Sequence, residues 1–218
     1  MRKFIWILGI LLVVSCARLD DIAFVNDNTI EAYFYDDWDE DPEFEMPLGK
    51  YDVADSMIHE LSLTSQGPND DEPYLIRAIY LGNLADVKTD SIIVYCHGQS
   101  LHMDAYWPRA TLLASLVNQH HYGVFMMDYR GYGMSEGTAS EQGLYEDVDA
   151  SIDWLIDQGA QPEKTFYYGF SLGCIPVIDR AACRTDFIPK KIIIESPLAS
   201  GAHLAQSSLI LNINPSYV

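Results

Sequence analysis

The chain has 218 residues, of which 49% are hydrophobic and 21% are charged, and this composition excludes a collagen-like, low-complexity or wholly disordered protein. Its 32 acidic and 13 basic residues give a net charge of −19. Such a charge argues against nucleic acid as a partner, because binding to phosphate needs a basic face, and it disfavours a broad attraction to anionic lipid.

The chain begins with a short basic segment followed by eleven apolar residues, Phe4 to Val14. This run is too short to span a bilayer, which takes about 20 residues, and it predicts the apolar region of a secretory signal. The sequence VVSC, which ends at Cys16, resembles the lipobox of bacterial lipoproteins. The resemblance implies a signal peptide over residues 1–15, a lipid anchor on Cys16 and, with Ala17 next, a place in the bacterial outer membrane. The alternative is an ordinary signal peptide with a chance cysteine.

Residues 16–50 are predicted to form an acidic tether. Seven of the ten residues in 36–45 are Asp or Glu, so calcium binding is one interpretation. The alternating Asp and Gly spacing of a calcium loop is absent, and we therefore expect a solvated, partly disordered stretch.

From residue 58 onward, apolar patterns predict strands and helices. The expected strands are 58–64, 75–81, 91–96, 123–127, 165–168 and 191–194, and the expected helices are 106–120, 141–158 and 172–183. The first two strands form a hairpin through a turn at 67–70, and the later strands, joined by helices, form a parallel sheet with right-handed crossovers. We therefore expect an α/β fold over residues 51–218, with a mostly parallel sheet and a leading antiparallel hairpin.

Three cysteines lie in this predicted domain: Cys96, Cys174 and Cys183. An odd number does not predict a disulfide framework, and their spacing does not match a zinc site. We expect all three to be buried thiols that behave as small hydrophobes, and no metal or organic cofactor is implied.

The sequence GFSLG, from Gly169 to Gly173, lies between a predicted strand and a predicted helix. This is the setting of a nucleophile elbow, a strained turn that holds a serine at the carboxyl end of a strand. Glycines flank the serine because side chains there would clash across the turn, and the following helix favours developing negative charge. The pattern predicts Ser171 as a nucleophile.

His97 and Gly98 follow an earlier buried strand at its carboxyl end, where open α/β sheets place their sites. With the GFSLG turn, they resemble the α/β-hydrolase superfamily, closest to its serine-aminopeptidase-like and lipid-hydrolase-like branches. The resemblance implies that the backbone N–H groups of Gln99 and Leu172 form an oxyanion hole. It also implies that His97 is structural and not the catalytic base.

The segment from Asp128 to Ser135, DYRGYGMS, is similar to a loop that follows the fourth strand in this superfamily. The resemblance, which runs from about residue 58 to 200, implies that Asp128 and Arg130 fix this loop. A metal held by Asp128 is the weaker alternative.

The chain departs from the family pattern in one respect. The family has an Asp after its seventh strand and a His after its eighth, whereas this chain ends at Val218, shortly after its sixth predicted strand. None of the histidines falls at the position of the base. The chain therefore corresponds to the N-terminal two-thirds of a hydrolase, either as a fragment or as a natural truncation, and we expect an open, apolar sheet edge.

The expected function is that of a serine hydrolase that acts on an ester, thioester or peptide acyl bond, anchored to a membrane by lipid, with the triad His and Asp beyond the end of this chain. The alternative is a non-catalytic, truncated lipoprotein that keeps the sheet for binding or interaction. A His and an Asp supplied beyond residue 218, or by a partner chain, would separate the two.

Overall fold

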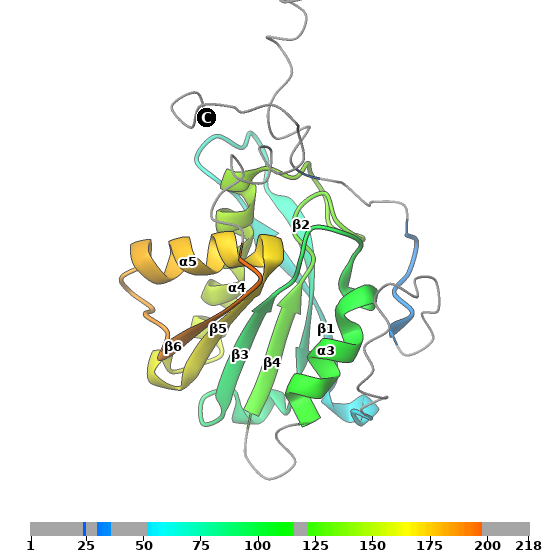
Figure 1. The fold of residues 1–218 in the computed structure, drawn as a ribbon, viewed down its shortest axis with the longest axis vertical. Helices are drawn as coiled ribbons and strands as arrows, with labels where there is room; N and C mark the ends of the chain where they lie inside the picture. The colour runs from blue at the N-terminus through cyan, green and yellow to red at the C-terminus, as the bar shows by residue number, and fades with distance from the viewer. Residues whose placement is uncertain (1–23, 25–29, 36–51, 116–121, 198–218) are drawn as a thin grey trace, which may run out of the picture.

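The computed structural model describes residues 24, 30–35, 52–115 and 122–197. Their sheet has the strand order β1-β2-β4-β3-β5-β6 (Figure 1). The strands are β1 (Ile58–Ser65), β2 (Tyr74–Leu81), β3 (Ser91–Cys96), β4 (Tyr122–Met127), β5 (Thr165–Phe170) and β6 (Lys191–Glu195). β1 pairs with β2 and β2 with β4 in antiparallel fashion, and the other pairs are parallel. The prediction of an α/β fold with a leading antiparallel hairpin is confirmed.

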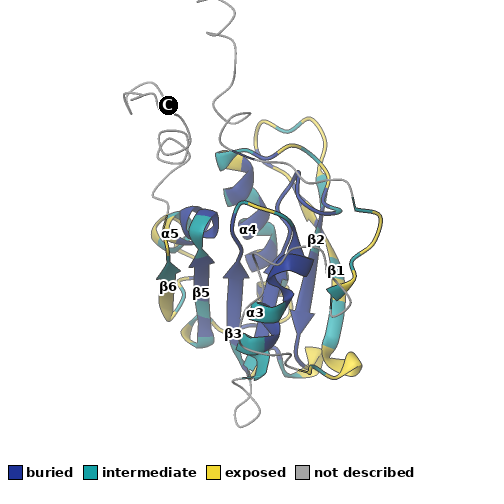
Figure 2. Ribbon diagram, turned by 45° about the vertical axis from the view of Figure 1, so that its right-hand side comes forward, coloured by how far each residue is buried: buried dark blue, intermediate teal, exposed yellow. Residues whose placement is uncertain are grey.

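Helices cover both faces of this sheet. They are α3 (Met103–Ser115), α4 (Glu141–Asp157) and α5 (Cys174–Cys183). Alternate residues of β3 serve the two faces: Ile92 and Val94 pack in the cluster that holds α4 and α5, whereas Ile93 and Tyr95 pack with α3. The central strands are accordingly buried on both sides (Figure 2), which explains why β3 is an uninterrupted apolar run.

Two element boundaries differ from the prediction in ways that matter for the site. β5 continues to Phe170, and a short 3-10 helix (Ser171–Gly173) separates it from α5, which begins at Cys174 and not at 172. α3 begins at Met103, three residues earlier than expected. Its buried residues lie between Met103 and Thr111 and include Tyr106 and Trp107, which pack in the core on this face of the sheet.

The prediction that all three cysteines are buried is wrong for Cys183. Cys96 and Cys174 are buried, but Cys183 is exposed, and all three are free thiols. The buried residues of α5 lie in its first turn, from Cys174 to Val177. Cys183 is the last residue of the helix, beyond that contact, so solvent reaches it.

A short part of the expected tether contacts the folded domain. Residues 30–35, which we call the strap, lie against α3 and the loop after β4 (blue in Figure 1), and Phe24 is 5% exposed within the core. The signal peptide, Cys16 and the acidic run 36–45 lie outside the described residues. Within the described ranges, no helix has the length and apolar character needed to cross a bilayer.

Strand β6 forms one edge of the described sheet. It pairs with β5 on one side, and among the residues that the structure describes no strand pairs with its other side. Ile192 and Ile193 are 44% and 45% exposed, so this edge presents apolar surface to its surroundings.

Candidate active site

Ser171 lies in a strained turn at the carboxyl end of β5. Its φ is 50°, a left-handed conformation that costs a non-glycine residue roughly 1–2 kcal/mol. A Cβ on Gly169 would come within 2.6 Å of the Gly173 carbonyl oxygen, and a Cβ on Gly173 would overlap the carbonyl oxygen of Cys96. The strained turn and its need for flanking glycines, both predicted from the sequence, are confirmed.

The loops after β3 and β5 leave the sheet side by side. Cys96 and Gly169 are paired in the parallel register of the two strands. The segments that begin at His97 and Ser171 therefore both start at the carboxyl ends of these strands. A Cβ on Gly173 would also lie 2.7 Å from the carbonyl oxygen of His97. The structure therefore packs the elbow against the loop of Gly98 and Gln99. Leu172 is buried and Gln99 is half-buried.

His97 is locked within the fold. Its Nδ1 lies 2.8 Å from the carbonyl oxygen of Gly98, and its Nε2 lies 3.0 Å from Oδ1 of Asp128. The ring lies between Tyr106 and Tyr129, with centroid separations of 4.8 and 4.7 Å. His97 is fully buried, and both nitrogens face groups other than Ser171, so this histidine is placed to support the loop.

Arg130 joins three parts of the domain. Its backbone N–H donates to Oδ2 of Asp147 on α4 at 2.7 Å, and its Nε donates to Oδ1 of the same residue at 3.1 Å. Its Nη1 lies 3.2 Å from Asp70 in the hairpin turn, and its Nη2 lies 2.8 Å from Glu146. Burial raises the pKa of Asp147, although the charge and hydrogen bonds of Arg130 oppose that shift. The loop after β4 is thereby tied to α4 and to the hairpin.

The other described histidines lie away from the elbow or are enclosed. His59 has its Nε2 3.0 Å from the carbonyl oxygen of Gly82. Gly82 follows the end of β2 that pairs with the start of β4, so His59 lies at the opposite end of the parallel strands from Ser171. His102 is buried, with its Nδ1 3.7 Å from Oδ2 of Asp104. His120, His121 and His203 lie outside the described residues.

Glu195, at the end of β6, is engaged with the α3 side of the sheet. It accepts hydrogen bonds from Arg109 and Tyr168. Burial raises the pKa of Glu195, but the hydrogen bonds from Tyr168 and Arg109 outweigh that effect and hold the pKa below its usual range. The carboxylate thus serves as the anionic partner of Arg109.

Sequence reasoning missed the contribution of the strap. Tyr33 donates a hydrogen bond of 2.6 Å to Oδ2 of Asp128, and the Asp104 carboxylate accepts from the backbone N–H groups of Phe34 and Tyr35. These residues precede an acidic run, and no periodic pattern distinguishes them from a tether. The one available signal is the pair of tyrosines at 33 and 35, whose rings stack 5.7 Å apart.

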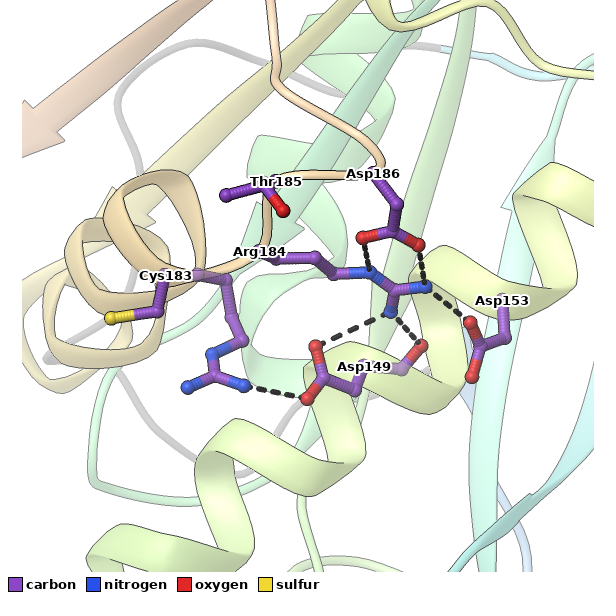
Figure 3. A pocket seen from close by; sticks show the side chains of 7 residues that line it. Asp149, Asp153, Cys183, Arg184, Thr185 and Asp186 are labelled. Atoms are coloured by element: carbon purple, nitrogen blue, oxygen red, sulfur yellow. Dashed lines mark hydrogen bonds and ion pairs between the residues drawn. The ribbon is translucent and has the colours of Figure 1, made fainter.

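A separate surface pocket lies between α4 and the C-terminal end of α5 with the segment that follows it (Figure 3). Its lining residues are Asp149, Asp153, Arg180, Cys183, Arg184, Thr185 and Asp186. Arg184 donates to the carbonyl oxygen of Asp149 at 2.9 Å and to Asp186 at 3.1 Å, and it also pairs with Asp153. Because the arginine is already surrounded by carboxylates, the pocket is an ion-pair network that joins two elements and not an open anion site.

Within the ranges that the structure describes, no three His, Cys, Asp or Glu side chains come together as a possible metal site. The Asp128 carboxylate, the candidate ligand from the sequence, has its two oxygens beside His97 and Tyr33.

Comparison with known proteins places this chain in a family. The family model described as serine aminopeptidase, S33, matches residues 87–213, more than half of the chain. The uncharacterized protein YfhR of Escherichia coli (strain K12) is 30% identical over 118 residues, which are 54% of this chain and 40% of that protein. Alpha/beta hydrolase domain-containing protein 17B of Xenopus laevis is 34% identical over 114 residues, 52% of this chain and 38% of that protein.

The chain thus spans about two fifths of the length of the curated relatives it matches. Among solved structures, the alpha/beta hydrolase GrgF from Penicillium sp. sh18 is similar with a TM-score of 0.52 and 16% identity, over 65% of this chain and 46% of that one. This likeness supports the fold alone. On the family match and the strand–elbow–helix architecture together, the chain belongs to the serine aminopeptidase S33 family of α/β-hydrolases.

Proposed function

We propose that this chain is the nucleophile-bearing part of a serine hydrolase that cleaves an ester, thioester or peptide acyl bond. The observation that carries the proposal is Ser171 itself. It has a φ of 50° in a turn whose two flanking glycines leave no space for a side chain, at the carboxyl end of a central parallel strand. Such a turn directs a serine Oγ out of the sheet toward a substrate.

In the proposed reaction, Ser171 Oγ attacks the acyl carbonyl carbon while a general base accepts its proton. The backbone N–H groups of Gln99 and Leu172 stabilise the resulting oxyanion. Collapse of the tetrahedral intermediate expels the alcohol, thiol or amine, which takes the proton from the base, and leaves an acyl-enzyme. Water then attacks the acyl group with the help of the same base and releases the acid.

The proposed base and its carboxylate partner lie beyond Val218. Two observations support this assignment. The described histidines are enclosed or lie at the far edge of the sheet: His97 is held by Asp128, His102 is buried beside Asp104, and His59 is bonded to Gly82. The matched relatives are also much longer than the segment that matches them.

Labelling with a fluorophosphonate tests the proposal. The gene product, read to its own stop codon, should label at Ser171, and Ser171→Ala should abolish labelling. Ser62→Ala, on β1, should leave it intact. The 218-residue chain alone should label orders of magnitude more slowly, because removing the base of a triad costs on the order of 10⁶ in turnover. A folded full-length product that fails to label would overturn the proposal and favour the non-catalytic lipoprotein.

We further propose that Cys16 is lipid-modified and that the protein resides in the bacterial cell envelope as an outer-membrane lipoprotein. The support is the basic start, the short apolar run and the VVSC sequence. Mass spectrometry of the N-terminal peptide from a membrane fraction should find an acylated Cys16. Cys16→Ser should release the protein from that fraction, and an unmodified Cys16 in the membrane fraction would contradict the proposal.

A further inference from the structure

The strap contacts the loop after β4 through one side chain, Tyr33. Its hydroxyl donates to Oδ2 of Asp128 at 2.6 Å and accepts from the backbone N–H of Met134 at 3.1 Å. Both partners belong to the loop after β4. Tyr33 therefore joins a segment from before the sheet to a carboxylate that is fully buried.

Asp128 in turn contacts the histidine of the loop after β3. Its other oxygen, Oδ1, lies 3.0 Å from Nε2 of His97, while Nδ1 of His97 lies 2.8 Å from the carbonyl oxygen of Gly98. A carbonyl oxygen and a carboxylate oxygen both only accept hydrogen bonds, so a ring that holds both contacts carries a proton on each nitrogen, as an imidazolium paired with Asp128. The order of contacts is Tyr33, Asp128, His97 and the Gly98 carbonyl.

The last contact matters because of peptide geometry. The carbonyl of Gly98 and the N–H of Gln99 belong to one planar peptide unit and point in opposite directions. Fixing the carbonyl by a hydrogen bond from His97 therefore fixes the direction of the Gln99 N–H, the proposed oxyanion donor. We propose that Tyr33 is a positioning residue that orients the Gly98–Gln99 peptide through Asp128 and His97, an inference that rests on the proposed function.

The surroundings of Tyr33 fit this role. A Cβ on Gly133 would overlap Oδ2 of Asp128 and lie 2.7 Å from the Tyr33 hydroxyl oxygen, so the glycine leaves the space in which the two groups meet. Burial, reinforced by the charge of Asp128, raises the pKa of Tyr33 well above its usual value. The hydroxyl consequently keeps its proton as a donor across the working pH range.

The strap itself is held by a second, independent contact. Oδ2 and Oδ1 of Asp104 accept from the backbone N–H groups of Phe34 and Tyr35 at 2.9 and 2.8 Å, and the Tyr35 ring lies 4.7 Å from that of Trp107. Removing the Tyr33 hydroxyl should leave these anchors intact. The conservative variant Tyr33→Phe thus isolates the contact with Asp128.

The series of contacts from Tyr33 to the Gly98 carbonyl is here called the relay. Hydrogen exchange of the 218-residue chain tests the relay without any need for activity. Tyr33→Phe should speed exchange in peptides that cover residues 97–101, by about tenfold, while peptides from α4 and β5 remain unchanged. Tyr35→Phe is the matched control, because it removes a hydroxyl of the same segment whose nearest charged partner is Glu60 on β1 and not a group of the loop after β4. If Tyr33→Phe speeds exchange only in the strap and the loop after β4, Tyr33 is merely structural and the proposal is overturned.

Kinetics of the full-length product give the second test. Loss of an oxyanion donor costs about 10²–10³ in kcat, and we expect a misoriented donor to cost roughly tenfold, with KM unchanged, because the contact acts on the transition state. In an Asp128→Asn background, Tyr33→Phe should have less than a twofold further effect. An equal effect in both backgrounds would contradict a path through Asp128. If wild type fails to label while exchange responds as expected, the proposed function falls and the relay stands.

Discussion

Backbone atoms, not side chains, lie closest to the two glycines that flank Ser171. Gly173 is pressed against the carbonyl oxygens of Cys96 and His97, which belong to a different strand and its loop. These atoms cannot move without disturbing the β3–β5 pairing. At this position the absence of a side chain is therefore a steric requirement, distinct from the conformational freedom that glycine provides elsewhere.

Gly173→Ala should lower the free energy of unfolding by about 3 kcal/mol, because the new methyl group would push the elbow away from the end of β3. Gly159→Ala is the informative control. Gly159 has a φ of 82°, but a Cβ there would lie 3.4 Å from Lys88, so only the backbone strain of roughly 1–2 kcal/mol applies. Urea unfolding followed by circular dichroism measures both. If both variants lost the same free energy of unfolding, the elbow would have to relax around the methyl group of Gly173→Ala.

At the scale of the elements, the buried ion pair of Arg130 and Asp147 connects the site loop to the rest of the domain. The Arg130 side chain is 4% exposed and that of Asp147 is fully buried. Such pairs add little net stability when complete, but removing one partner leaves an uncompensated charge in the core.

Arg130→Met should therefore cost about 3–5 kcal/mol at pH 8. The pKa of Asp147 is already raised by burial, and losing Arg130 raises it further. The folded state then binds the proton more tightly than the unfolded state, so the variant should gain stability as the pH falls from 8 toward 5.

Urea unfolding at several pH values measures this dependence. Arg184→Met is the comparison, since the carboxylates of its partners Asp153 and Asp186 are largely exposed, and it should cost less than 1 kcal/mol. If the two variants lose the same stability, the buried pair does not carry the special role assigned to it.

The elements also show what could be foreseen from the sequence. β3 and β4 were predictable because they are apolar on both faces, and the elbow was predictable because only glycines fit beside Ser171. The start of α3 was not, since its buried face depends on aromatic residues that pack under the strap. The strap itself escaped prediction because its contacts are two carboxylates, Asp104 and Asp128, that lie about 70 to 95 residues farther along the chain.

For the molecule as a whole, the described sheet ends in an apolar edge. Ile192 and Ile193 of β6 and Ile188 just before it are exposed there, and the outer side of β6 pairs with no strand within the described residues. An edge of this kind is a template for association with another strand.

The 218-residue chain should accordingly self-associate as its concentration rises, and Ile192→Lys should suppress this with less than a 2 °C change in Tm, by analogy with the charged residues that protect natural edges. Light scattering against concentration provides the measurement. Ile156→Lys, which alters a residue of α4 with 39% exposure, is the control and should leave association unchanged. Suppression by both variants would point to net charge and not to the edge.

Phe24, buried in the core, has a consequence for the reach of the protein. Cys16 lies eight positions before Phe24, so under the proposed acylation of Cys16 the distance between the lipid and the core is at most about 29 Å. That distance is roughly the thickness of the hydrocarbon core of a bilayer and equals several Debye lengths at physiological salt. At full extension, salt would screen most of the electrostatic repulsion between a chain with a charge of −19 and anionic headgroups. The domain would still be confined to the layer of solution beside its own membrane.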